Sequence, residues 1–211
     1  MTPEHKFHSY VTVATVIFMF YVIDLVVPRL TFSPELNQYI KPVVIIFSTV
    51  GIYRALAALV VGLAKRWNWV KRWLLGAHYL GGTWVGSFKS ASGETIRPVE
   101  HFEQSLSTLK IRGQAFNEFG ESYALWNSVS ENIDAVSGLL TYTYNCDKDS
   151  EKYSFQGIGV FHFQRADSTC APTSIRGYSA DLTDGKRTDN EERKYSDRLI
   201  AFNEVLRAIK I

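Results

Sequence analysis

The chain has 211 residues and a formal net charge of +2, with 46% hydrophobic and 14% aromatic residues. A charge this close to zero argues against general binding of DNA or RNA polymers, which takes a dense basic surface. Apolar residues form long uninterrupted runs before about residue 65 and alternate with polar residues after it. The chain therefore divides into two parts of different character, which whole-chain averages conceal.

Two apolar runs near the N-terminus predict transmembrane helices. The first extends from about Tyr10 to Val27 and the second from about Val43 to Leu63. Each is long enough to cross a hydrocarbon core of ~30 Å, which takes roughly 20 helical residues. A cleaved signal peptide is the alternative for the first run, but the run lacks a small-residue cleavage site and a second span follows it. We therefore predict a two-helix transmembrane domain over residues 1–64.

Basic residues set the predicted orientation of the two spans. The segment after the second span combines basic residues with tryptophans: Lys65, Arg66, Trp67, Trp69, Lys71, Arg72 and Trp73. The positive-inside rule then places both termini in the cytoplasm and the short connecting loop outside, and tryptophans at this position are typical of a membrane interface. We expect a juxtamembrane linker over residues 65–80 in a two-pass protein of the bacterial inner membrane, in contact with lipid.

Two ionisable residues, Asp24 and Arg54, lie inside the predicted spans. Their depths in the membrane differ by about 12 Å on the helical rise, which exceeds the reach of one arginine side chain. A direct ion pair between them is therefore not expected. Next to Arg54 runs a stripe of small residues at helical spacing, namely Gly51, Ala55, Ala58 and Gly62. Small residues let helices approach closely in lipid. The stripe either packs against the first span of the same chain or joins chains in a homo-oligomer, and both alternatives stay open.

The part after Leu80 predicts a β-domain. Seven segments alternate with period two: Gly82–Lys89, Thr95–Gln104, Thr108–Phe116, Tyr123–Ser130, Leu139–Cys146, Phe155–Gln164 and Ser174–Leu182. A hairpin-type turn at Asp184-Gly185 suggests an eighth strand near Lys186–Tyr195. A helix is predicted from about Asp197, with the apolar stripe Leu199, Phe202, Leu206 and Ile209, and we expect it to cover one barrel end.

These elements give the predicted fold class. It is an α+β membrane protein in which a two-helix transmembrane hairpin precedes a small antiparallel β-barrel of about eight strands with a C-terminal helix. The barrel domain is expected over residues 81–211, on the cytoplasmic side of the membrane. Glycines inside the predicted strands, such as Gly113, Gly157, Gly159 and Gly177, suit strong bending.

Signatures of catalysis are absent from the sequence, which has no nucleophile elbow, phosphate-binding loop or zinc-protease helix. We therefore predict no enzyme activity, no catalytic residue, no metal and no cofactor. His101 and His162 lie alone on predicted strands, where packing or hydrogen bonding is the usual role of a histidine. Cys146 and Cys170 are interpreted as reduced thiols of a cytoplasmic domain in preference to a disulfide.

Binding of a small ligand is the more plausible activity, because an eight-stranded barrel can hold one in its interior or mouth. Aromatic residues stack on bases and arginines bind phosphates. The candidate ligand-binding residues are Trp84, Arg112, Tyr142, Tyr144, His162, Arg176 and Tyr178. For Trp84, and for Trp126, a place in the apolar core is the alternative.

The order of these parts resembles a family of bacterial antiphage effectors. Two spans, a linker rich in Lys, Arg and Trp, an opening strand with Gly81-Gly82-Thr83-Trp84-Val85-Gly86 and a compact barrel resemble the two-span, β-strand-rich effectors of cyclic-oligonucleotide-based (CBASS) immunity. The resemblance covers essentially the whole chain and concerns architecture, so it assigns no ligand residue. Gly-x-Trp-x-Gly openings also occur in lipocalin-like barrels.

The resemblance implies a sequence of events. A partner nucleotidyltransferase would make a cyclic dinucleotide during infection, the barrel would bind it, and the protein would assemble and compromise the inner membrane in an abortive infection. The alternative hypothesis is a membrane-anchored, lipocalin-like carrier of an apolar molecule, or a structural scaffold. A carrier needs an apolar cavity without a phosphate-binding arginine, whereas an effector needs an arginine facing the pocket and a self-associating span.

Overall fold

The structure is a computed structural model that describes residues 2–29, 34–90, 93–148 and 154–209. Part of the loop predicted between the two spans lies outside the described residues. The chain forms two compact units, Met1–Leu74 and Leu75–Ile211.

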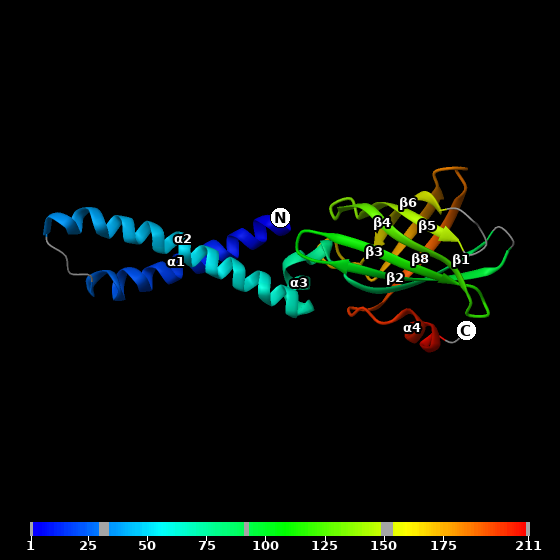
Figure 1. The fold of residues 1–211 in the computed structure, drawn as a ribbon, viewed down its shortest axis with the longest axis horizontal. Helices are drawn as coiled ribbons and strands as arrows, with labels where there is room; N and C mark the ends of the chain where they lie inside the picture. Colours follow the sequence, from blue (N-terminus) through cyan, green and yellow to red (C-terminus); the bar gives the residue numbers. More distant parts are fainter. Residues whose placement is uncertain (1, 30–33, 91–92, 149–153, 210–211) are drawn as a thin grey trace. The chain divides into compact units, whose positions relative to one another are not determined.

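The N-terminal unit is a helical hairpin. Helix α1 spans Pro3–Leu25 and is followed by the 3-10 turn η1, Val27–Arg29; helix α2 spans Pro34–Arg66 and the short helix α3 spans Asn68–Leu75. Thr2 caps α1 by accepting a hydrogen bond from the His5 backbone N–H at 3.3 Å. Helices α1 and α2 run beside each other (Figure 1). Both are long and apolar enough to cross a membrane.

Helix α2 begins well before the predicted start of the second span. Its first helical residue is Pro34, where the chain was predicted to form a loop up to Val43. Proline suits the first turn of a helix because its missing N–H would have no intrahelical acceptor there. The apolar run therefore marks the part of α2 suited to lipid, and the helix itself extends beyond that part.

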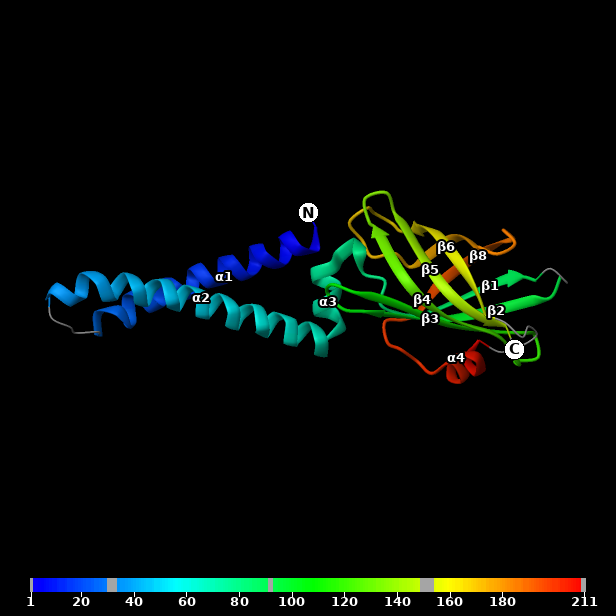
Figure 2. The ribbon, with the colours of Figure 1, turned by 45° about the horizontal axis from the view of Figure 1, so that its top comes forward.

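The C-terminal unit is a closed antiparallel barrel with strand order β1-β2-β3-β4-β5-β6-β7-β8, in which β8 pairs back onto β1 (Figure 2). A 3-10 turn η2, Gly76–His78, precedes it. The strands are β1 Gly82–Lys89, β2 Thr95–Gln104, β3 Leu109–Phe116, β4 Ser122–Asp134, β5 Leu139–Lys148, β6 Ser154–Gln164, β7 Ser174–Asp181 and β8 Arg187–Ser196. The hairpin, the eight-stranded barrel and a C-terminal helix confirm the predicted fold class.

The barrel interior has an apolar half near the start of β1. The side chains that fill this half are almost fully buried: Leu80, Trp84, Phe102, Leu109, Ile111, Leu140 and Ile175. The Trp84 indole N–H donates to the Leu80 carbonyl at 2.7 Å, which satisfies its only donor without water. This packed half closes one end of the barrel, so any open interior space lies toward the other end.

The C-terminal helix α4, Phe202–Ala208, packs on the outside of the barrel wall. Val205 is fully buried against Val99 of β2 and Phe116 of β3, and α4 lies outside the barrel beside β2 (Figure 2). The prediction that this helix covers a barrel end is therefore wrong. The helix also begins later than predicted, because the chain from Asp197 to Ala201 is not helical and runs along the barrel.

His101 helps to hold the non-helical segment Asp197–Ala201 against the barrel. Its ring stacks on Phe202 with centroids 4.1 Å apart, and its Nε2 is 2.6 Å from the Ile200 carbonyl oxygen, to which an Nε2–H donates. Thr83 adds a hydroxyl that donates to the Arg198 carbonyl at 2.7 Å and accepts from the Ile200 N–H at 2.9 Å. The prediction that His101 is a packed, hydrogen-bonded residue is confirmed.

Candidate ligand-binding site

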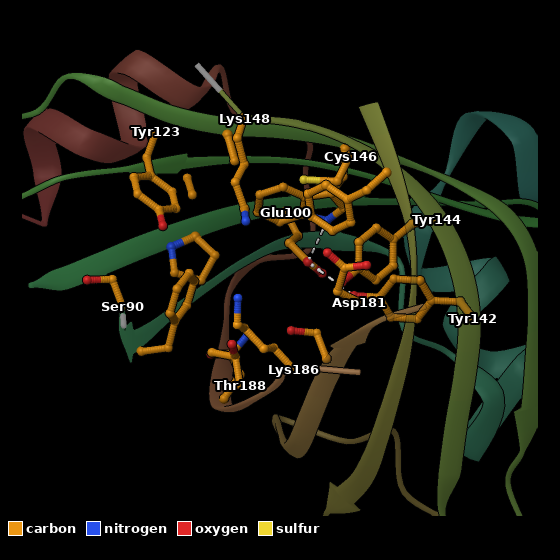
Figure 3. A pocket seen from close by; sticks show the side chains of 18 of the residues that line it. Ser90, Glu100, Tyr123, Tyr142, Tyr144, Cys146, Lys148, Asp181, Lys186 and Thr188 are labelled. Atoms are coloured by element: carbon orange, nitrogen blue, oxygen red, sulfur yellow. Dashed lines mark hydrogen bonds between the residues drawn. The ribbon is translucent and has the colours of Figure 1, made fainter. Parts of the chain in front are cut away.

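The half of the barrel away from the packed end encloses a cavity of about 360 Å³. This volume falls within the range of about 300–1,000 Å³ that small-ligand sites occupy. Aromatic rings make up much of its wall: Phe88, Tyr123, Trp126, Tyr142, Tyr144, Phe155 and Phe161. In Figure 3, Tyr142 and Tyr144 lie on one side of the central Glu100 and Tyr123 on the other. The wall can therefore contact both faces of a planar ligand.

Glycines on neighbouring strands make room for these rings. Gly113 on β3 pairs with Trp126 on β4, and Gly157 on β6 pairs with Tyr144 on β5. A Cβ atom at Gly113 would lie 2.1 Å from the Trp126 ring, and one at Gly157 would lie 2.3 Å from the Tyr144 ring. Each large ring thus lies flat against the backbone of the next strand, and the centre of the barrel stays open.

Glu100 from β2 lines the floor of the cavity, and a second buried carboxyl group, Glu192 from β8, lies next to it. Glu100 Oε1 accepts hydrogen bonds from the Trp126 indole N–H at 2.9 Å and from the Tyr142 hydroxyl at 3.3 Å. Glu192 Oε1 accepts from the Asn190 side-chain amide at 2.7 Å. A further hydrogen bond joins the two carboxyl groups to each other. Since a carboxylate has no proton to donate, this bond requires one proton held by the pair.

Burial governs the ionisation of this group. Loss of hydration raises the pKa of Glu100 to about 7, against a lowering by its hydrogen bonds from Glu192, Trp126 and Tyr142. Burial, and then the charge of Glu100, raise the pKa of Glu192 well above its usual range. The pKa of the Tyr142 hydroxyl is also raised well above its usual value, by burial and then by Glu100, so it stays a donor. Because Glu100 Oε1 accepts two hydrogen bonds, the ionised form is favoured at Glu100 and the shared proton at Glu192.

The mouth of the cavity carries both signs of charge. Lys148 at the end of β5 and Lys186 in the turn before β8 line it, together with Asp181 and Asp184. Lys148 lies over the Phe155 ring at 4.8 Å from the centroid, and Lys186 pairs with Asp184 at 2.7 Å. The lysines place ammonium groups where a ligand enters, above an aromatic wall.

Of the predicted ligand-binding residues, the structure brings two into the cavity. Tyr142 and Tyr144 both line it, from β5. Trp84 lies instead in the packed half, stacked on Phe102 with centroids 5.3 Å apart. Arg112 lies on the outer face of β3, where it forms an ion pair with Glu103 of β2.

The other three predicted residues lie on the outer face of β6 and β7. His162 and Arg176 are cross-strand neighbours and line a shallow outer groove of about 620 Å³ together with Arg187 and Glu191. The Tyr178 ring is covered by the Arg187 guanidinium, 3.8 Å from its centroid. Arg176 and Tyr178 thus share a strand face, as the sequence predicts, but this face points away from the cavity.

The most distinctive residues of the cavity are ones that sequence analysis did not select. Glu100 lies on β2, while its partner Glu192 comes from β8, far away in the sequence. Period-two alternation carried the signal, because Glu100 stands between the inward-facing Pro98 and Phe102. Cys146 also lines the cavity, and both cysteines are free thiols, as predicted.

In the N-terminal unit, the small-residue stripe faces away from α1. Gly51, Ala55, Ala58 and Gly62 are all exposed, as is Arg54 beside them. A Cβ atom placed on Gly51 or on Gly62 would have no neighbour within 4 Å. Within this chain, therefore, α1 does not cover the stripe.

Comparisons with known proteins show similarity to solved structures. No family model matches the chain, and no curated protein matches it. Among solved structures, a redesigned β-barrel, mFAP1, bound to DFHBI matches with a TM-score of 0.40 and 21% identity, covering 56% of this chain and 98% of that one. A de novo designed fluorescence-activating β-barrel matches with a TM-score of 0.35 and 17% identity, covering 56% of this chain and 95% of that one.

Proposed function

We propose that the barrel binds a cyclic dinucleotide and that the two apolar helices hold it at the cytoplasmic face of a bacterial inner membrane. The observation that carries the proposal is the cavity, whose aromatic wall lies beneath two lysines at its mouth. A base stacked on an aromatic side chain gains ~1–3 kcal/mol. Lysine binds phosphate as a point charge. A ligand with planar bases and anionic phosphates fits both features.

The proposal extends to a ligand-triggered effector of CBASS immunity, in line with the resemblance of the chain's architecture to that family. A partner nucleotidyltransferase supplies the ligand, and bound barrels gather their helices into a homo-oligomer that disrupts the membrane. The exposed stripe on α2 supports this extension, because small residues at helical spacing favour close helix association in lipid. Arg54 beside the stripe adds a polar group that is costly in hydrocarbon unless it finds water or a partner.

The cavity floor counts against the carrier hypothesis. A carrier of an apolar molecule needs an apolar interior, whereas Glu100 and Asn190 place polar atoms at the floor. Burying such atoms against an apolar ligand would leave them without water or a donor. The cations at the mouth are Lys148 and Lys186, and the described lining residues contain no arginine of the kind predicted for an effector.

Isothermal titration calorimetry on the full-length protein in detergent tests the binding step. The titrants are a panel of cyclic dinucleotides and, for the carrier hypothesis, palmitate. We expect saturable binding of at least one cyclic dinucleotide, weakened by added salt because phosphate charge is neutralised at the mouth. Heat from palmitate and from none of the cyclic dinucleotides would overturn the proposal.

A charge substitution at the mouth sharpens the test. Lys148→Gln should weaken cyclic dinucleotide binding roughly tenfold, the value of one charge-assisted contact of ~1.5 kcal/mol. Lys186→Gln should cost less, because the Lys186 side chain is exposed and solvent screens its charge. Lys110→Gln on the outer face of β3 is the matched control and should leave affinity unchanged. Arg176→Ala tests the outer groove. A larger loss of affinity in this variant than in Lys148→Gln would place the binding site outside the barrel.

A further inference from the structure

The cavity floor presents acceptors for which the protein supplies no donor. Asn190 Oδ1, Glu100 Oε2 and Glu192 Oε2 are buried, and apart from the proton shared by the two carboxyl groups no side-chain or backbone donor in the described part of the chain reaches them. Asn190 is 9% exposed and Glu100 is 2% exposed, and both line the cavity. The proton held between the carboxyl groups satisfies the contact between the two glutamates. Asn190 Oδ1 and the remaining lone pair of Glu100 Oε2 still lack a donor, and both belong to side chains that line the cavity.

The donors around the floor fix which groups remain acceptors. The Asn190 amide nitrogen is directed at Glu192, so its carbonyl oxygen is turned away from that carboxyl. Trp126 and Tyr142 both donate to Glu100 Oε1, and two donors on one oxygen favour Glu100 as the ionised member of the pair. An unpartnered buried acceptor costs roughly 1–3 kcal/mol, so a ligand that donates here gains more than one that only fills space.

From this geometry we infer that the floor binds the N–H edge of a guanine base, with Glu100 and Asn190 accepting from the base, so that the ligand is a guanine-containing cyclic dinucleotide. The inference rests on the proposed function and adds the identity of the base. Guanine presents a ring N1–H and an exocyclic 2-amino group side by side, which are two donors for two acceptors. A purine is also planar and suits the walls formed by Trp126, Tyr142 and Tyr144.

The other bases match the floor less well. Uracil offers a single ring N–H between two carbonyl oxygens, which would face the acceptors of the floor. Adenine and cytosine offer an amino group beside a ring nitrogen that is itself an acceptor. Leaving a buried polar group unpaired is what gives such a site its selectivity against a wrong ligand.

The ligand panel tests the inference on the unmodified full-length protein in nanodiscs, by calorimetry with cyclic di-GMP, cyclic di-IMP, cyclic di-AMP and cyclic di-UMP. Cyclic di-GMP should bind tightest. Cyclic di-IMP, which lacks only the 2-amino group, should bind roughly tenfold more weakly for each base seated on the floor. Cyclic di-AMP and cyclic di-UMP should bind more weakly still.

The outcomes of this panel separate the two proposals. If cyclic di-AMP or cyclic di-UMP binds as tightly as cyclic di-GMP, the inference fails and the proposed function stands. If no cyclic dinucleotide binds, both fail. Tighter binding of agmatine, which carries a guanidinium group and no base, would assign the floor to a cationic ligand and overturn the inference.

A variant pair on one strand locates the recognition. Glu100→Gln replaces one acceptor oxygen by an amide of the same shape and should remove the preference for cyclic di-GMP over cyclic di-IMP. Glu103→Gln, on the outer face of the same strand, is the matched control and should keep that preference. Melting curves check that both variants fold. A folded Glu100→Gln variant with unchanged base preference would contradict the inference.

Discussion

Glu100 and Glu192 lie together between the packed half of the barrel and the cavity, where neither is reached by bulk water. Taking a carboxyl group out of water is costly, and replacing a buried polar cluster by apolar side chains often stabilises a protein. Pairs of this kind with strongly perturbed ionisation gather at functional sites. We interpret the pair as a binding feature that the barrel retains at a cost in stability.

The same pair predicts how stability depends on pH. In the unfolded chain both carboxyl groups lose their protons near their ordinary pKa of 4.5, while in the folded barrel the pKa of Glu100 is about 7 and that of Glu192 is also raised well above 4.5. At a pH between the unfolded and the folded pKa values, the folded state binds more protons than the unfolded state. The free energy of unfolding therefore falls as pH rises, by at most about 1.4 kcal/mol per pH unit for each extra proton. Thermal melts of the full-length protein from pH 5 to pH 8 should show this fall.

Glu192→Gln isolates the contribution of the pair. It keeps the shape of the side chain and removes one titrating group, so the decline of the melting temperature with pH should be shallower than in the unmodified protein. Glu191→Gln, an exposed neighbour that pairs with Arg193, should leave the decline unchanged. The difference between the two variants cancels the contributions of the other titratable groups at the cavity, which both retain. Equal slopes in the two variants would mean that the carboxyl pair ionises normally.

Period-two alternation places these residues on strand faces but does not show which of them lie together. Glu100 is inward by simple alternation along β2, yet its partner comes from β8, and the two strands meet only through β1 after the barrel closes. Strand order and closure depend on long-range pairing that no local pattern encodes. For the same reason alternation correctly assigns Arg176 and Tyr178 to one face, while it does not determine which side of the wall that face is.

At the scale of the elements, strands were easier to predict than the C-terminal helix. Alternation and turn residues marked the barrel strands, and β1 and β2 match their predicted bounds. Helix α4 has a short apolar stripe that fits several surfaces equally well. Its place on the wall is decided by Thr83 and His101, which hold the preceding chain through hydrogen bonds to Arg198 and Ile200. Such contacts are specific to the tertiary structure.

The pairing of Gly113 with Trp126 gives a prediction about the barrel wall. A Cβ atom at Gly113 would lie 2.1 Å from a rigid indole ring, so Gly113→Ala must displace Trp126 from the wall into the cavity. Overpacking of this kind costs roughly 1–3 kcal/mol. The variant should therefore unfold at lower denaturant and should also bind cyclic dinucleotide more weakly, because the displaced ring fills the cavity.

A control on the same strand separates overpacking from loss of strand propensity. Lys110 is exposed on β3, so Lys110→Ala should change the free energy of unfolding by no more than about 0.5 kcal/mol. Chemical denaturation followed by tryptophan fluorescence measures both variants. A Gly113→Ala variant as stable as Lys110→Ala would show that the Trp126 ring does not lie against the β3 backbone.

At the scale of the whole molecule, the chain joins a barrel with an internal cavity to a hairpin whose small-residue surface is not covered by α1. Linking a weak interface to a second association event raises its effective concentration, so helices that do not associate alone can do so once barrels gather. This arrangement requires the interface on α2 to be weak in the absence of ligand. It also requires the interface to depend on small side chains, because close approach of helices in lipid is lost when one of them is enlarged.

The stripe on α2 provides the last prediction. Gly51→Leu or Ala58→Leu should abolish cyclic dinucleotide-dependent crosslinking and dye release from liposomes, yet leave insertion and ligand affinity unchanged. Val50→Leu is the matched control, since Val50 is also exposed but lies about 100° around the helix from Gly51.

Arg54→Leu should insert at least as well as the unmodified protein, because it removes a charge that costs ~2.5–3.5 kcal/mol at the helix centre. If Arg54 lines a hydrated centre, this variant should also lose dye release while it still crosslinks. Full dye release from Gly51→Leu, Ala58→Leu and Arg54→Leu alike would mean that the helices serve as passive anchors, and assembly through α2 would be excluded.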